Sequence, residues 1–294
     1  MIPRVTSQTM MRSALNNLQS TMSELAKLQE QASSRKLISR PSDDPTGTAN
    51  ALTIRAEQRA NEQYGRNISD GDAWLNTVDS ALSNASTLMN KIRDLTVKGA
   101  NDGVLSPSAK EAIAVELESL RSELLSQANA TYLGRSVFAG NSDVGEAFTS
   151  TFAYTGAPGS SVERRIGPGT TVRVDADGAA VFGVGTDSVF ALVSTIVSDL
   201  RSGTNIGGHL ASIDGHQEAV RGRHATVGAR HAEIQRAMEV NVEKSVSLEG
   251  QRAEVEDIDL TKTILGLQMQ EVAYQSALAV TARVLQPTLM DFLR

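Results

Sequence analysis

Hydrophobic residues near the start of the chain recur every three and four positions. Between residues 11 and 32 they fall on one side of a helix, with one polar interruption. This is the a and d spacing of a coiled coil, so the pattern predicts a long amphipathic helix that packs against a partner helix. The seam consists of Met11, Leu15, Leu18, Met22, Leu25, Gln29 and Ala32.

A short segment with two prolines interrupts this pattern. Pro41, Ser42, Asp43, Asp44 and Pro45 follow one another there. Asparagine-like side chains and proline favour a turn, and Asp44 before Pro45 is typical of a helix N-cap followed by proline at the first helical position. A second helical pattern then runs from about residue 46 to about residue 100, and a third begins near residue 106.

The pattern changes in the middle of the chain. Between residues 132 and 185 glycines are frequent and apolar residues alternate with polar ones, which is the period of a β-strand. Residues 171–174 and 180–182 lie on either side of Asp177-Gly178, a dipeptide that favours tight hairpin turns. The sequence therefore predicts a small β-rich insertion at residues 137–186.

Helical spacing returns after the insertion and continues almost to the end. A single helix from residue 207 onward would be on the order of 120 Å long, at ~1.5 Å per residue. Glycines weaken a helix, so we expect bends at Gly215, Gly222, Gly228, Gly250 and Gly266. The apolar stripe near the end consists of Leu260, Ile264, Leu267, Tyr274, Leu278 and Leu285.

These patterns together predict a mainly α protein with a small β insertion. We expect an elongated antiparallel helical bundle or coiled coil in which the N- and C-terminal helices pair. The C-terminal segment is apolar on more than one side, which favours a bundle of several subunits over an isolated pair. The expected divisions are an N-terminal assembly helix and loop (1–45), the first part of the bundle (46–136), the β-rich insertion (137–186), the second part of the bundle (187–250) and a C-terminal assembly helix (251–294).

Composition narrows the possible functions. Aromatic residues make up only 4% of the 294 residues, which suits helices packed along narrow stripes. A net charge of −6 argues against general attraction to nucleic acid. The chain has no cysteine, so disulfides, thiolate catalysis and cysteine zinc sites are excluded. We expect no membrane insertion and no general secretory signal, because no apolar run approaches ~20 residues.

Four histidines form a regular row in the returning helical segment. His209, His216, His224 and His231 are spaced by seven, eight and seven residues. Seven residues of helix rise about 10 Å, which is too far for one metal ion to bridge. His224 and His231 also fall on the apolar seam, so we interpret them as polar contacts that set the register against a partner helix. A pH-sensitive contact and a metal site remain alternatives.

No catalytic motif is present. The sequence lacks a phosphate-binding loop, a nucleophile elbow and a zinc-protease helix motif. Asp175-Ala176-Asp177-Gly178 resembles part of a calcium loop, but Thr186 stands where the twelfth-position glutamate belongs. We therefore expect a protein that is not an enzyme, with no catalytic, metal or cofactor-binding residues and no cofactor.

Four motifs, in this order along the chain, resemble the flagellin superfamily. They are closest to its hook–filament junction proteins, the third hook-associated proteins. The loop Ser34–Pro45 ends in the Pro-Ser-Asp-Asp-Pro typical of that branch, and filament flagellins have a different version. The other three motifs are Tyr132–Gly140, with its Phe-Ala-Gly element, Val227–Arg230 and Pro287–Arg294.

The resemblance implies a structural subunit of the bacterial flagellum. Such a subunit joins the hook, through the first hook-associated protein, to the flagellin filament. It implies export by the flagellar type III system, an extracellular location, and disordered terminal segments that form an inner coiled-coil tube on assembly. The implied partners are copies of the same chain in a ring, the first hook-associated protein, flagellin with the filament cap, and an export chaperone. A filament flagellin is the nearest alternative, and a metal-dependent hydrolase on this scaffold would require a clustered ligand set.

The seams and the resemblance together predict which residues lie in the assembly interface. They occupy both ends of the chain, and the proline-bounded loop Pro41–Pro45 accompanies them as the family motif. The expected interface residues are Met11, Leu15, Leu18, Met22, Leu25, Leu260, Ile264, Leu267, Tyr274, Leu278, Leu285, Leu289 and Phe292.

Overall fold

A computed structural model describes residues 7–101, 105–157 and 159–284. The structure is 74% helical, and its described part contains seven α-helices and two small antiparallel sheets. The predicted mainly α fold with little β structure is therefore confirmed. The chain divides into two compact units, one formed by residues 1–59 with 245–294 and the other by residues 60–244.

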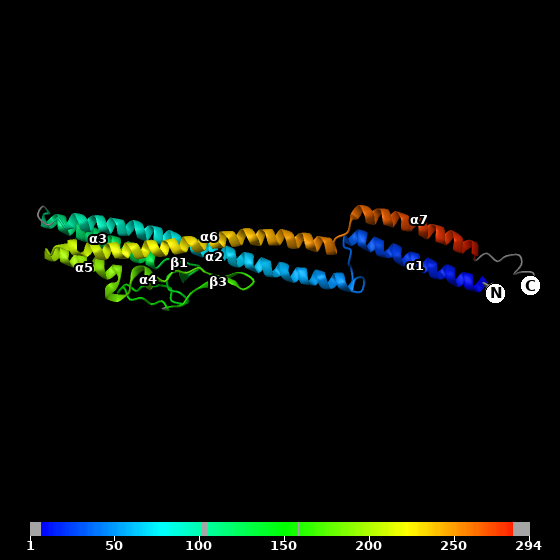
Figure 1. Cartoon of the computed structure of the whole chain (residues 1–294), viewed down its shortest axis with the longest axis horizontal. Coiled ribbons are helices and arrows are strands. Elements are labelled where there is room, and N and C mark those ends of the chain that lie inside the picture. The colour runs from blue at the N-terminus through cyan, green and yellow to red at the C-terminus, as the bar shows by residue number, and fades with distance from the viewer. Residues whose placement is uncertain (1–6, 102–104, 158, 285–294) are drawn as a thin grey trace, which may run out of the picture. The chain divides into compact units, whose positions relative to one another are not determined.

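Figure 1 shows the order of the elements along the chain. Two short 3₁₀ turns, Gly185–Asp187 and Ile206–His209, precede α5 and α6. The helices are α1 (Ser7–Ser34), α2 (Pro45–Gly99), α3 (Pro107–Ala128), α4 (Gly178–Phe182), α5 (Val189–Ser202), α6 (Leu210–Glu256) and α7 (Leu260–Val284). The strands are β1 (Thr131–Tyr132), β2 (Arg135–Ser136), β3 (Glu163–Gly167) and β4 (Thr170–Arg173).

The unit at residues 60–244 is organised by antiparallel pairing of α2 with α6, which run side by side in Figure 1. Every seventh residue along each helix faces inward, as the heptad spacing requires. The Asn61 amide donates to the Asn241 carbonyl at 3.0 Å, and the Asn241 amide donates back to Asn61 at 2.9 Å. The buried heptad residues are Asn61, Ile68, Leu75, Leu82, Met89 and Thr96 on α2 and Ile213, Val220, Val227 and Ile234 on α6.

Polar contacts flank this apolar seam. His231 Nε2 lies 2.8 Å from Asp72 Oδ1, and His224 Nε2 lies 2.7 Å from Asp79 Oδ1. Both histidines lie on α6 and both aspartates on α2, one heptad apart on each helix. The interpretation of His224 and His231 as contacts with a partner helix is therefore confirmed, and the partner is α2 of the same chain.

The predicted Asp-Gly hairpin is wrong. Asp177 is the N-cap of α4, where its side chain accepts hydrogen bonds from the next two backbone N–H groups it can reach. Its φ of −76° is incompatible with the positive φ that a type I′ turn requires. The hairpin lies earlier, where β3 pairs with β4 and the turn contains Gly169 at a φ of +75°.

The insertion has an aromatic core of its own, although little of it is β-strand. Phe148 and Phe182 pack edge to face at 5.8 Å between ring centroids, and both contact Phe190 at the start of α5. Phe138 and Phe152 complete the cluster. The few aromatic residues of the chain are thus concentrated in one place, and the long helices use aliphatic residues.

Two contacts attach the insertion to the helices. Arg164 on β3 pairs with Asp70 on α2 and lies over the ring of the buried Trp74, 5.4 Å from its centroid. Arg230 on α6 donates to the backbone oxygen of Asp175 at 2.9 Å. Asp175 is fully buried, and its carboxylate is held by Arg173 at 2.8 Å. Arg230 belongs to the sequence motif Val227–Arg230, so that motif joins the returning helix to the insertion.

The expected uninterrupted helix from residue 207 to the C-terminal region is also wrong. It divides between Glu256 and Leu260, where Asp259 caps α7 by accepting a hydrogen bond from the Lys262 N–H at 3.1 Å. None of the glycines expected to bend the helix ends it: four lie inside α6 and Gly266 lies inside α7. Favourable capping by aspartate, rather than weak helix propensity of glycine, sets the end of the helix.

Removing one side of the asparagine pair should destabilise the unit at residues 60–244. We expect Asn241→Ala to cost about 1–3 kcal/mol because the buried Asn61 side-chain oxygen loses its donor. Asn61→Leu with Asn241→Leu should recover most of that loss, because no buried polar group is left unpaired. Urea unfolding followed by the fluorescence of Trp74, the single tryptophan, measures both. Ser69→Ala, at an exposed position of α2, is the control. A double variant no more stable than Asn241→Ala would contradict this account.

Candidate assembly interface

The terminal helices α1 and α7 pair in antiparallel fashion and lie side by side in Figure 1. The Gln270 amide on α7 donates to the Thr21 carbonyl oxygen on α1 at 3.2 Å. A Cβ at Gly266 would lie 3.9 Å from the Leu28 side chain, so the two helices approach closely at this glycine. The predicted pairing of the N- and C-terminal helices is thus present within one chain.

Only some of the predicted interface residues lie between the two helices. Leu18 and Leu25 on α1, with Leu267 and Tyr274 on α7, are half-buried. The other described members are exposed, and they leave an apolar strip along the edge of the pair. The exposed members are Met11, Leu15, Met22, Leu260, Ile264 and Leu278. Leu285, Leu289 and Phe292 lie outside the described residues.

The inner seam contains residues that the hydrophobic pattern did not reveal. On α1 it includes Thr21 and Leu28, and on α7 it includes Gly266, Gln270 and Thr281. Three of these five are polar, so a search for apolar residues follows the neighbouring strip instead. The small and polar residues at heptad spacing from Leu25 and Tyr274 were the available signal.

The outward faces of the two helices differ in chemistry. On α7 a row of large apolar residues points away from α1: Leu265, Met269, Val272 and Val280. Met269 is 66% exposed. On α1 a shallow depression of the surface is lined only by polar residues: Asn16, Gln19, Ser20, Ser23, Glu24 and Lys27. The pair therefore has one polar side and an apolar side that water covers in the isolated chain.

The loop between α1 and α2 folds as a turn and a cap. The Arg40 N–H donates to the Asp43 carboxylate at 2.9 Å, and the Gly47 N–H donates to the Asp44 carboxylate at 2.9 Å. Pro45 is the first residue of α2. The expected roles of Asp43 in a turn and Asp44 as N-cap are confirmed, and neither is left available as a catalytic carboxylate.

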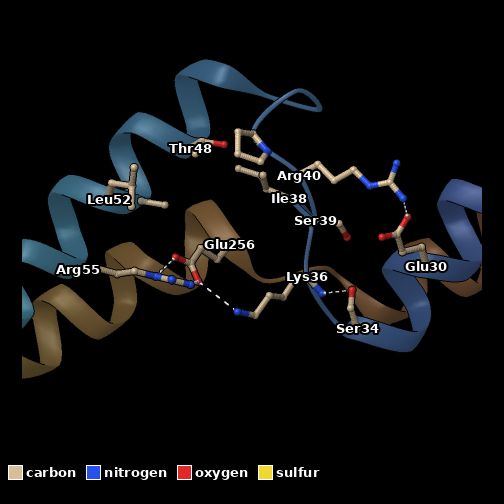
Figure 2. Close-up of a pocket in the computed structure, with 12 residues that line it drawn as sticks. Glu30, Ser34, Lys36, Ile38, Ser39, Arg40, Thr48, Leu52, Arg55 and Glu256 are labelled. Atoms are coloured by element: carbon tan, nitrogen blue, oxygen red, sulfur yellow. Dashed lines mark hydrogen bonds and ion pairs between the residues drawn. The ribbon is translucent and has the colours of Figure 1, made fainter.

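Glu256 fastens this loop to the junction between α6 and α7. Figure 2 shows its carboxylate between the side chains of Arg55 and Lys36. Arg55 donates to both carboxylate oxygens, at 2.6 and 2.7 Å, and Lys36 Nζ lies 3.9 Å away. The backbone repeats the connection, because the Leu37 N–H donates to the Glu256 carbonyl oxygen at 2.7 Å. We call these four residues the clasp.

The clasp borders a cavity of about 470 Å³. Its walls are mixed, with Ile38, Pro41 and Leu52 beside the charged groups (Figure 2). The hydrogen bond from Arg55, and then the positive charges of Arg55 and Lys36, lower the pKa of the buried Glu256 carboxyl. A carboxylate held in this way is a structural ion pair, since its oxygens already have donors.

The described residues offer no alternative chemistry. In them no three histidine or acidic side chains lie close enough together to hold a metal ion. A search of the same residues for helices finds none long and apolar enough to cross a bilayer.

The comparison with known proteins agrees with the exposed helical surfaces. The family model for the bacterial flagellin N-terminal helical region matches residues 5–143. Flagellar hook-associated protein 3 of Salmonella typhimurium is 27% identical over 214 residues, which cover 68% of this chain and 67% of that protein. The protein of the same name from Escherichia coli is 27% identical over 195 residues, 65% of this chain and 58% of its own length.

This chain is a homologue of flagellar hook-associated protein 3, in the flagellin superfamily. Matches to filament flagellins are weaker. A putative flagellar hook-associated protein from Vibrio parahaemolyticus has the same fold, with a TM-score of 0.67 at 21% identity over 73% of this chain and all of that one. The homologues are structural proteins of the flagellum, an extracellular appendage.

Acid should loosen the clasp. The lowered pKa means that ionised Glu256 stabilises the loop above the ordinary carboxyl pKa, and that this stabilisation is lost as the pH falls through the lowered value. We expect Glu256→Gln to cost about 1–2 kcal/mol locally at pH 7, since charge-assisted hydrogen bonds are lost.

Hydrogen exchange of the segment around Leu37, corrected for intrinsic rates, measures this effect. Exchange in Glu256→Gln should be faster at pH 7, and the difference from the native chain should shrink in acid. Glu254→Gln changes an exposed carboxylate two residues away and should have no effect. Equal exchange in the native chain and Glu256→Gln at pH 7 would rule out the clasp.

Proposed function

We propose that this chain is a structural subunit of the bacterial flagellum that joins the hook to the flagellin filament. The observation that carries the proposal is the apolar surface of the α1–α7 pair. Large apolar side chains line one edge of the pair and the outer face of α7, where Met22 is 58% and Met269 66% exposed. Contiguous exposed apolar surface on a folded chain indicates a site of association.

The two exposed regions call for more than one neighbour. The edge strip and the outer row of α7 lie on different sides of the same helix, so one partner helix cannot cover both. Copies of the same chain arranged in a ring would bury both regions and leave the polar face of α1 in water. The predicted interface residues at the two termini, including Leu285, Leu289 and Phe292, belong to this surface in our proposal.

The further partners follow from the relatives' role. The first hook-associated protein lies on the hook side, and flagellin with the filament cap lies on the other. We assign export to the flagellar type III system, with a cytoplasmic chaperone binding the C-terminal region before export. The subunit then resides outside the cell, in the flagellum, and has no enzymatic activity.

A filament flagellin is the competing function within the same superfamily. The loop Pro41–Pro45 and the relatives named hook-associated protein 3 favour the junction. A hydrolase on the same scaffold has little support, because His224 and His231 are each engaged by an aspartate.

A deletion strain distinguishes the two flagellar roles. Cells without this chain should keep their hooks and release flagellin monomers into the medium, because the filament has nothing to attach to. Electron microscopy of the cells and immunoblots of the medium are the measurements. Full-length filaments on the deletion strain would contradict the junction role.

Polar substitutions on the outer face of α7 should block assembly without unfolding the chain. We expect Met269→Gln with Val272→Gln to leave the helix content unchanged by circular dichroism, because both residues are exposed. The variant chain should be exported yet fail to restore filaments to the deletion strain. Ser20→Gln with Ser23→Gln, on the polar face of α1, is the matched control and should restore them. Full restoration by the α7 variant would exclude that face from the interface.

A further inference from the structure

One exposed residue in the unit at residues 60–244 is unusual in both conformation and surroundings. Leu133 is 80% exposed and has a φ of +50°. With Gly134 at +78° it forms the two-residue turn between β1 and β2. A type I′ turn needs positive φ at both positions and favours asparagine or aspartate before glycine. A branched apolar residue there is strained, and such strain is concentrated at functional positions.

The turn is held rigidly. The strand residues on either side of it, Tyr132 and Arg135, pair with each other and both contact the buried Trp74. The Tyr132 ring lies 5.5 Å from the indole ring, and the Arg135 guanidinium lies 5.8 Å from it. Leu133 is therefore presented to solvent on a fixed base, and little conformational freedom would be lost on binding.

A groove on the same face offers a matching surface. It lies between α2 and the end of α3, has a volume of about 390 Å³ and is mostly apolar. Ala81 is a buried residue of its lining, Ser80 and Asn84 are exposed on α2, and Ala130 closes one end. Leu133 follows Ala130 by three residues but does not fill the groove, because the paired strands and Trp74 hold the turn outward.

We propose that Leu133 of one copy inserts into the α2–α3 groove of a second copy. The knob and the groove are different surfaces of the same chain, so the contact is head to tail. Repetition of such a contact produces a ring or a helical array rather than a closed dimer. The inference rests on the proposed function and adds to it a lateral contact that is separate from the terminal helices.

The absence of cysteine from the chain permits a direct test. A chain with both Leu133→Cys and Ser80→Cys is expressed in the deletion strain, and isolated flagella are treated with a mild oxidant. A head-to-tail contact should give a ladder of disulfide-linked oligomers on non-reducing gels, while each single variant should remain monomeric. Leu133→Cys dimers on their own would indicate a two-fold contact and would overturn the proposal.

The outcome separates this inference from the assembly role. Flagella that contain the double variant but yield no ladder would overturn the knob-and-groove contact and leave the junction function standing. Absence of the native chain from flagella would contradict both.

A second variant tests the energetics without cross-linking. Leu133→Asn should keep or raise the unfolding temperature, because asparagine suits the turn, and should reduce incorporation into flagella about tenfold. Val144→Asn, at another exposed apolar residue of the same unit, is the control and should incorporate normally. Normal incorporation of Leu133→Asn would also overturn the proposal.

Discussion

The antiparallel register of α2 and α6 is the constraint on which the rest of this structure depends. The two helices are separated by more than a hundred residues, and the Asn61–Asn241 pair with the two histidine–aspartate contacts fixes how they align. Apolar heptads alone would tolerate a shift by seven residues, because each repeat resembles the next. A buried asparagine pair does not, since a shifted register would leave its amides unpaired. Trp74, Arg230 and the contacts of the insertion lie at fixed positions along these helices, so they inherit that register.

The same logic is relaxed at the terminal helices. The α1–α7 seam places Thr21, Gln270 and Gly266 where α2 and α6 have isoleucine, leucine and valine. A pair with so little apolar contact between its helices, and so much on its outside, gains more by associating with further copies than by closing on itself. The clasp then matters because it ties both chain interruptions of that unit, at the loop and at the α6–α7 junction, to one carboxylate.

Much of the fold could be predicted from the sequence because heptad spacing is a strong signal. The start of α2 at Pro45, the cap by Asp44 and the α6 contacts of His224 and His231 all follow from local rules. The hairpin at Asp177 could not, because the same aspartate can cap a helix or form a turn, and packing against Phe138 decides between them. The inner seam of the terminal helices was also hidden, since its polar members do not register in a hydrophobic pattern. Leu133 is invisible to the sequence, because its significance lies in its backbone angle and exposure.

The aromatic core of the insertion has a consequence for how this protein can vary. Five phenylalanines form a nucleus between the strands and α5 that does not share residues with the heptads of α2 and α6. Loops around that nucleus, such as the one that contains Val144, can change in length or surface chemistry without disturbing helix register. Natural selection on the outer surface of a flagellum can therefore act on the insertion while the helical framework stays the same.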